Sequence, residues 1–220
     1  MKKLLTILAI LLSVVEIKGQ FFESINQVSG VAFTKIYYNN YPNTQNGPLI
    51  YPQPTMGLTS GFNVSYLNHK YWNLNSQIMI LQIGGQSQSE LLDNNNNNVG
   101  TLTSDFYFNY LTFNTTFQIK YPFEFMCTSI KIGPRIDYLL WSTTSSATQY
   151  TSIPVSSFNN FNYGLDLGIA LSKTFNEKFI LSFESTYNMQ FYNMANYQPY
   201  LYVKSLRSIS VLIGFGYKFK

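Results

Sequence analysis

The charged side chains that could do chemistry recur at alternate positions. In the stretch KIGPRIDYLL, Lys131, Arg135 and Asp137 are separated by even numbers of residues, so an extended strand would place them on one face. The matching face of other segments carries Lys120, Asp166, Glu184 and Lys218. Enclosed together, these four bases and three acids would form ion pairs, because an unpaired buried charge is costly. We expect Arg135 to be the hub, since its planar fork can bind two carboxylates, and we favour a structural network over a conduction or proton path.

The inventory of bases and nucleophiles argues against catalysis. His69 is the only histidine, and general acid–base chemistry near neutral pH most often uses that side chain. It falls in an expected short turn, on the side opposite the long connections, so we interpret it as a turn residue, which leaves no Ser-His-acid or His-containing metal site. Asp166 and Glu184 could act as an acid–base pair, but the bases nearby favour ion pairs. Cys127 is the single cysteine, which excludes an internal disulfide and a Cys-cluster metal site. We predict no enzymatic activity and no cofactor.

The elements that must carry these residues repeat with a period of two. Large apolar residues alternate with small or polar ones, which indicates β-strands. The pattern gives eight segments, at roughly 28–38, 55–67, 71–85, 105–121, 124–141, 161–175, 178–192 and 206–219. Each is long enough to cross a membrane, because a tilted strand needs about 9–11 residues. The first and third fit least well: Lys35 falls on the bulky face, and the alternation slips near Leu81 to Ile83, where we expect a bulge.

Composition decides the class of barrel. Charged residues make up 11% of the 220 residues, tyrosine and phenylalanine contribute 18 each, and the mean hydropathy is −0.04. A soluble barrel of the lipocalin type would cover its outer face with Lys and Glu. The polar face here is Gly, Ser, Thr, Asn and Ala, which are small enough for a crowded lumen. The sequence therefore predicts an all-β fold, an eight-stranded antiparallel up-and-down transmembrane β-barrel.

The connections predict the orientation. Short turns at residues 68–70, 121–123 and 176–177 alternate with long polar stretches near 39–54, 86–104, 142–160 and 193–205. Outer-membrane barrels have short periplasmic turns and long external loops. We therefore expect periplasmic termini and four long, irregular external loops.

The first 19 residues form a separate element. Two lysines precede an apolar run from Leu4 to Val15, and a short polar stretch ends at Gly19. This is typical of a cleaved secretory signal peptide and is too short for a membrane span. We predict a signal peptide at 1–19, a barrel domain at 20–220 and export to the bacterial outer membrane. Its partners would be outer-membrane lipid and another outer-membrane or surface protein, and not nucleic acid, which an exported chain would not meet.

The order of the motifs resembles the PorT-like outer-membrane β-barrel family of Bacteroidota. The resemblance rests on a Gly-spaced early strand and on YLTFNTTFQIKYPFEF, KIGPRIDYLL, FNYGLDLGIAL and GFGYKF, and it covers essentially all of the mature chain. Two departures are the LTFNTTF run, where the family has a proline, and Lys220 beyond Phe219. The resemblance implies an eight-stranded outer-membrane barrel but no single activity, since its members include a secretion-system component.

These inferences favour a non-enzymatic accessory or structural subunit of an outer-membrane complex that binds through its external loops. Aromatic residues in the third and fourth loops favour contact with a protein or saccharide; they are Tyr150, Phe158, Tyr197, Tyr200 and Tyr202. A small-solute channel and an adhesin-like surface-binding protein are the alternatives. Strand number argues against a diffusion pore, which normally has about 16 strands or more.

Overall fold

The computed structural model describes residues 22–38, 51–67, 69–92, 97–146, 149–151, 160–191 and 203–219, and the predicted signal peptide lies outside them. The strands are β1 (Phe22–Tyr38), β2 (Tyr51–Gln53), β3 (Thr55–Tyr66), β4 (Trp72–Leu92), β5 (Asn98–Pro122), β6 (Cys127–Ser146), β7 (Gln149–Thr151), β8 (Phe161–Phe175), β9 (Phe179–Gln190) and β10 (Val203–Lys218). Among the described residues, none forms a helix long and apolar enough to cross a membrane.

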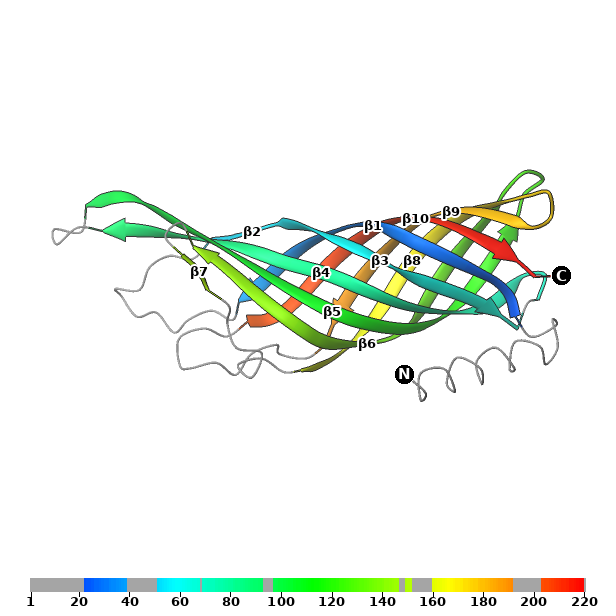
Figure 1. The fold of residues 1–220 in the computed structure, drawn as a ribbon, viewed down its shortest axis with the longest axis horizontal. Coiled ribbons are helices and arrows are strands. Elements are labelled where there is room, and N and C mark those ends of the chain that lie inside the picture. Colours follow the sequence, from blue (N-terminus) through cyan, green and yellow to red (C-terminus); the bar gives the residue numbers. More distant parts are fainter. Residues whose placement is uncertain are drawn as a thin grey trace, which may run out of the picture.

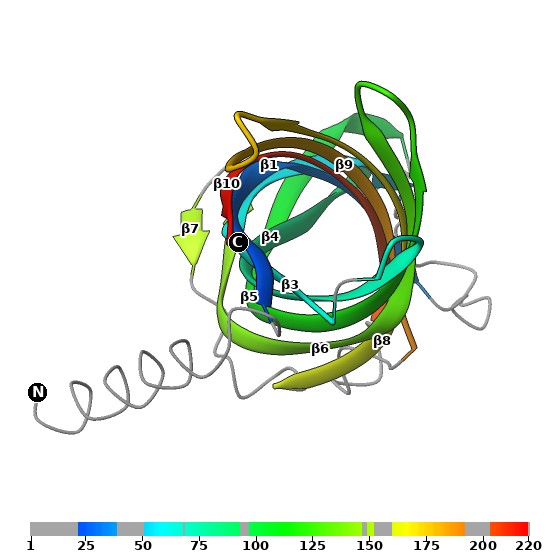
Figure 2. The same cartoon turned by 90° about the vertical axis from the view of Figure 1, so that its right-hand side faces the viewer.

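The long strands close into a ring. Their order is β3, β1, β10, β9, β8, β6, β5, β4, and β4 then pairs with β3. The seam joins the first and last strands, antiparallel from Ser24 opposite Lys218 to Tyr38 opposite Val203. Figure 2, which looks along the molecule, shows the closed ring. The predicted eight-stranded antiparallel barrel is confirmed.

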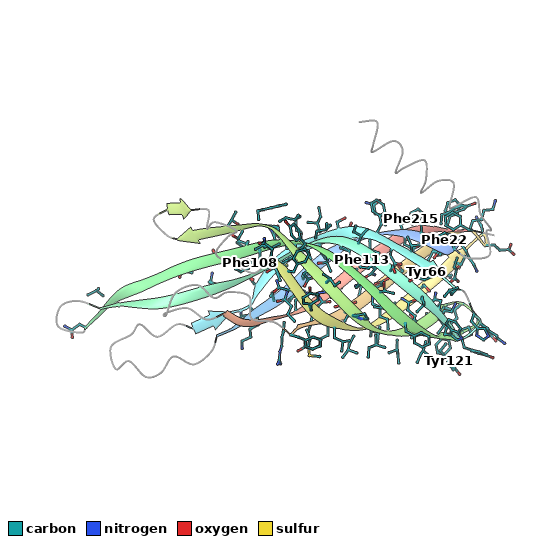
Figure 3. The ribbon with its side chains drawn as sticks, turned by 90° about the horizontal axis from the view of Figure 1, so that it is seen from below. Phe22, Tyr66, Phe108, Phe113, Tyr121 and Phe215 are labelled. Atoms are coloured by element: carbon teal, nitrogen blue, oxygen red, sulfur yellow. The ribbon has the colours of Figure 1, made fainter. Side chains whose placement is uncertain are left out.

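Side chains alternate between the outer wall and the lumen, as strand geometry requires. On β3, Leu58 is 68% exposed, whereas the next residue, Thr59, is 3% exposed. Figure 3 shows side chains such as Phe113, Tyr121 and Phe215 on the wall, and all three are largely exposed. The apolar wall and polar interior are the reverse of a soluble barrel and match a barrel surrounded by lipid.

Small residues on the inner face are needed because opposite side chains approach closely. A Cβ atom added at Gly214 would press against the Ser182 hydroxyl and the side chain of Val28. The crowded lumen inferred from the sequence therefore explains this glycine.

The two ends of the barrel differ, as the connection lengths predicted. Tight turns join β3 to β4, β5 to β6 and β8 to β9 at one end, where β1 begins and β10 ends (Figure 1). The turn between β8 and β9 has Asn176 and Glu177 in the left-handed region, at φ 48° and 60°. One predicted turn is misplaced: Tyr121 and Pro122 still pair with β6, and the chain reverses over residues 123–126.

The prediction of an irregular loop at 86–104 is wrong. The strands β4 and β5 stay paired from Trp72 opposite Ile119 to Leu92 opposite Asn98, and they form a long hairpin that projects from the barrel (Figure 1). A polar sequence suggested a loop, but outside the membrane a strand needs no apolar face. Short strands flank this extension, with β2 pairing with β4 and β7 with β6. The described parts of the other long connections are small, and most of their residues lie outside the described ranges.

Two further expectations about strands are corrected. The pairing of β4 with β5 runs through Leu81 and Ile83 without a shift, so the slip in alternation is not a bulge in that ladder. On the other side of β4 the register changes by one residue between Leu81, opposite Thr59, and Gln86, opposite Gln53. The side chains of Leu81 and Ile83 point into the lumen and are 1% exposed. The preceding residue, Ile80, faces outward. The alternation slips because both faces of β4 are apolar here. The first strand also starts earlier than 28, since Ser24 to Gln27 pair with both β3 and β10.

The arrangement of the ends makes a topology prediction. In a Cys127→Ser background, Asn97→Cys at the tip of the β4–β5 hairpin should react with an impermeant maleimide on intact cells. Lys70→Cys in the tight turn before β4 should react only after the outer membrane is opened, because short turns face the periplasm in barrels of this kind. Mass spectrometry of the labelled protein gives the readout. The reverse pattern would invert the proposed orientation.

Candidate functional site in the barrel lumen

The inward residues of β6 form successive layers across the lumen. From the tight-turn end they are Ser129, Lys131, Gly133, Arg135, Asp137 and Leu139. Lys131, Arg135 and Asp137 are at most 2% exposed. Charged groups buried to this extent must be held by partners, because desolvation costs several kcal/mol per ion.

The first buried layer centres on Glu184 of β9. Lys131 Nζ lies 2.5 Å from Glu184 Oε2. The same carboxylate accepts hydrogen bonds from Asn63 Nδ2 at 3.2 Å and from Gln77 Nε2 at 3.0 Å. One ammonium and two amides from three different strands therefore surround this carboxylate.

Arg135 organises the second layer. Its Nε and Nη2 donate to Asp137 Oδ2 at 3.1 and 2.8 Å, and its Nη1 donates to Asp166 Oδ1 at 3.3 Å. Asn114 Nδ2 donates to the other oxygen of Asp166 at 2.6 Å. Gln190 Nε2 donates to Asp137 Oδ2 at 3.1 Å. The planar guanidinium thus binds two carboxylates, one on its own strand and one on β8.

Neutral amides link the two layers. Asn114 Nδ2 also donates to Gln77 Oε1 at 3.2 Å, and Gln77 in turn holds Glu184. The chain of contacts runs from Glu184 through Gln77 and Asn114 to Asp166, and it joins β3, β4, β5, β6, β8 and β9 across the lumen. We refer to these side chains as the lumen network, namely Asn63, Gln77, Asn114, Lys131, Arg135, Asp137, Asp166, Glu184 and Gln190.

Two of the predicted network residues lie elsewhere. Lys120 pairs with Glu23 at 3.6 Å, near the tight-turn end. Lys218 also lies there, at the end of β10, and its backbone N–H donates to the carbonyl of Lys178. Both lysines line the cavity at the tight-turn end of the lumen.

The tight-turn end of the lumen is hollow. A cavity of about 350 Å³ is lined there mainly by polar side chains, among them Glu23, Asn26, Asn73, Lys120 and Lys218. His69 and Lys70 of the first tight turn lie at its edge, and Glu184 and Asn63 lie at its inner end. We call this cavity the vestibule. It opens at the tight-turn end and reaches inward to the first charged layer.

The opposite side of the lumen network is apolar. Leu139 follows Asp137 on the inner face of β6, and neighbouring strands contribute further side chains that are at most 2% exposed: Leu81, Ile83, Phe108 and Tyr110. Phe108 is labelled in Figure 3, toward the end from which the hairpin projects. This apolar layer was not predicted. The sequence does carry a signal for this layer, because residues 78–83 are apolar on both faces of the strand. From the sequence alone, this loss of alternation indicated a bulge.

The structure also shows what was missed around the charges. Glu23 was overlooked because its strand was predicted to begin five residues later. The amides Gln77 and Asn114 lie on the predicted inner faces, so their parity could have identified them. Which amide meets which carboxylate depends on contacts across the lumen, and strand alternation alone does not determine these.

The geometry of the carboxylates does not resemble an acid–base pair. Glu184 lies opposite Ala170 and Asp166 lies opposite Asn188, so the two acids are offset along neighbouring strands and bind different bases. His69 is an exposed turn residue that stacks on Trp72 with ring centroids 5.6 Å apart. Within the part of the chain that the structure describes, no group of three or more His, Cys, Asp or Glu residues could hold a metal ion.

The sequence matches the family described as outer membrane protein beta-barrel domain over residues 24–191. The chain therefore belongs to this family, and its fold and family place it in the bacterial outer membrane. The narrower resemblance to PorT-like proteins of Bacteroidota stays a prediction. A search of the curated proteins finds no match.

Several solved outer-membrane barrels are similar to this chain. Ail, the attachment invasion locus protein of Yersinia pestis, is 15% identical, with 90% of this chain and 99% of that chain covered and a TM-score of 0.38. OprG from Pseudomonas aeruginosa is 12% identical, with coverage of 91% and 98% and a TM-score of 0.43. The outer membrane protease OmpT from Escherichia coli is 9% identical, with coverage of 90% and 97% and a TM-score of 0.41.

The lumen network makes a stability prediction. Arg135→Met leaves the carboxylates of Asp137 and Asp166 buried without their cation, so it should lower the free energy of unfolding by about 3–5 kcal/mol. Heat-modifiability on gels or denaturant titration of the purified barrel would measure the loss. Arg207→Met removes an exposed arginine on the outer face of β10 and should change stability far less. Equal losses in both variants would show that the buried contacts do not stabilise the barrel.

Proposed function

We propose that the protein is a non-enzymatic outer-membrane barrel that serves as an accessory or structural subunit and recognises a partner with the sheet projecting from its long-connection end. The observation that carries this proposal is the combination of a filled lumen with a strand extension outside the barrel. Enzyme function is disfavoured by the ion pairing of the buried carboxylates and by the exposed turn position of His69.

The filled lumen supports this assignment. Two layers of ion pairs and an apolar layer occupy the interior between the vestibule and the projecting hairpin. A solute entering the vestibule would have to break buried salt bridges and then pass Tyr110 and Leu139. The cost of exposing such charges makes steady diffusion unfavourable.

The projecting sheet offers the surface that the barrel wall does not. The strand β5 has 25 residues, whereas about 9–11 residues cross the hydrocarbon of a membrane. The excess extends the hairpin well beyond the barrel, since each strand residue adds about 3.3 Å. Together with β2, β6 and β7, the hairpin forms an open sheet outside the ring (Figure 1). Tyr150 of the predicted aromatic set belongs to β7, and the other four residues lie outside the described ranges.

Removal of the hairpin tests the proposal. Ser87 and Ser104 are directly paired, so an Asn-Gly turn can join them in place of residues 88–103. The shortened barrel should insert and keep its heat-modifiability, because the lumen network is intact. Its recovery of co-purifying proteins after gentle detergent extraction should fall by about tenfold or more, which corresponds to about 1.4 kcal/mol of binding.

A matched control keeps the strands and alters only their connection. It joins Leu92 to Asn98 by Asn-Gly, removes residues 93–97, and should retain the partner. If the barrel without residues 88–103 keeps its partners and complements a deletion strain, recognition does not use the projecting sheet.

The vestibule favours one other function, a small-solute channel, and a conductance measurement separates the two. In planar bilayers the purified protein should show no steady conductance of porin size, because the lumen network and the apolar layer block the path. Opening should require removal of the charged side chains of both ion-pair layers and of the apolar layer, for example Leu139→Ala combined with alanine at Lys131, Glu184, Arg135, Asp137 and Asp166. Steady currents from the unaltered protein would favour the channel.

A further inference from the structure

The charges of the second buried layer do not balance. Among the residues that the structure describes, Arg135 is the one cation in salt bridges with Asp137 and Asp166, while Lys131 is bound to Glu184. The group formed by Arg135, Asp137 and Asp166, which we call the Arg135 group, therefore carries a surplus of one negative charge when both aspartates are ionised. Asp137 and Asp166 are 0% and 1% exposed, and an uncompensated charge at such depth is costly.

Four of the buried oxygen atoms without a hydrogen-bond partner belong to Asp137, to the residues opposite it or to the glutamine bonded to it. Asp137 Oδ1 has none in the described structure, and its other oxygen takes all the bonds from Arg135 and Gln190. The two residues directly opposite Asp137 are Thr112 on β5 and Asn162 on β8. Thr112 Oγ1, Asn162 Oδ1 and Gln190 Oε1 are also without hydrogen-bond partners. All four side chains are more than nine-tenths buried.

The nitrogens of these two amides are already engaged in hydrogen bonds. Gln190 Nε2 donates to Asp137, and Asn162 Nδ2 donates to the Tyr110 hydroxyl at 3.4 Å. Their carbonyl oxygens therefore remain as acceptors. Directly opposed residues on neighbouring strands have Cβ atoms about 4.5–5.5 Å apart, so the oxygens of Thr112, Asp137 and Asn162 belong to one row of the lumen.

We propose that this row, together with Gln190, which is bonded to Asp137, binds a monovalent metal cation, with Na⁺ as the ion of choice, through Asp137 Oδ1, Asn162 Oδ1, Gln190 Oε1 and Thr112 Oγ1. Carboxylate, carbonyl and hydroxyl oxygens suit hard cations. A single positive charge balances the surplus of the Arg135 group, whereas a divalent ion would leave an opposite surplus. The ion is a structural part of the lumen, and this role is separate from recognition by the projecting sheet.

The test uses the full-length mature barrel in a neutral detergent, with NaCl exchanged for choline chloride at constant ionic strength. Binding to the folded state alone stabilises it by linkage, so the heat-modifiability midpoint should rise with Na⁺ and not with choline. Asp137→Asn should abolish this dependence, and it should bind no Na⁺ in equilibrium dialysis where the unaltered barrel binds about one ion per chain. The matched control is Asp105→Asn, which removes a carboxylate bonded to Gln86 on the hairpin and should leave the Na⁺ dependence unchanged.

A second pair of variants keeps every charge. Asn162→Leu and Gln190→Leu each remove one ligand oxygen, and each should raise the half-saturating Na⁺ concentration by about tenfold. These two variants test the proposal if Asp137→Asn does not fold. A midpoint independent of Na⁺ overturns the proposal, because the surplus is then balanced by a proton. A Na⁺ dependence that survives these substitutions places the ion elsewhere and overturns it too. A response to Ca²⁺ but not to Na⁺ overturns the choice of a monovalent ion.

Discussion

The constraint on which the structure depends is that backbone N–H and C=O groups in hydrocarbon must find partners within the chain. The pairing of β1 with β10 satisfies it by removing both sheet edges. Closure with eight strands makes the lumen narrow, and the narrow lumen forces side chains from different strands into contact. The ion pairs, the amide bridges and the need for glycine at position 214 all follow from this closure.

The membrane also explains which parts of the fold the sequence could predict. Residues 161–175 were located to the residue, because hydrocarbon outside and a crowded lumen inside impose a strict alternation on β8. The prediction failed at residues 86–92 and 98–104, which continue as strands where no lipid imposes a pattern. It failed again at Leu81 and Ile83, whose inward side chains form an apolar layer in the lumen. A rule that expects polar residues on the inner face treats these two as a break in the strand pattern.

For the charged residues, too, the sequence could predict one property and not another. Parity placed Lys131, Arg135, Asp137, Asp166 and Glu184 on the inner face, and the structure has them there. It also placed Lys120 and Lys218 on that face, but it could not assign their level along the axis, which depends on register and tilt. The pairing of Lys120 with Glu23 required the true start of β1, which a weakly alternating stretch of polar residues concealed.

The seam has a consequence for how the barrel forms. Most neighbouring strands are also neighbours in sequence and can associate as hairpins, but Ser24 and Lys218 come from opposite ends of the described chain. Contacts between such distant residues are slow to form, because the entropy of closing the intervening chain is lost before any bond compensates for it. The ring can therefore be completed only after β10 has been delivered to the membrane. Until then, β1 and β10 are open edges that need protection from pairing with other chains.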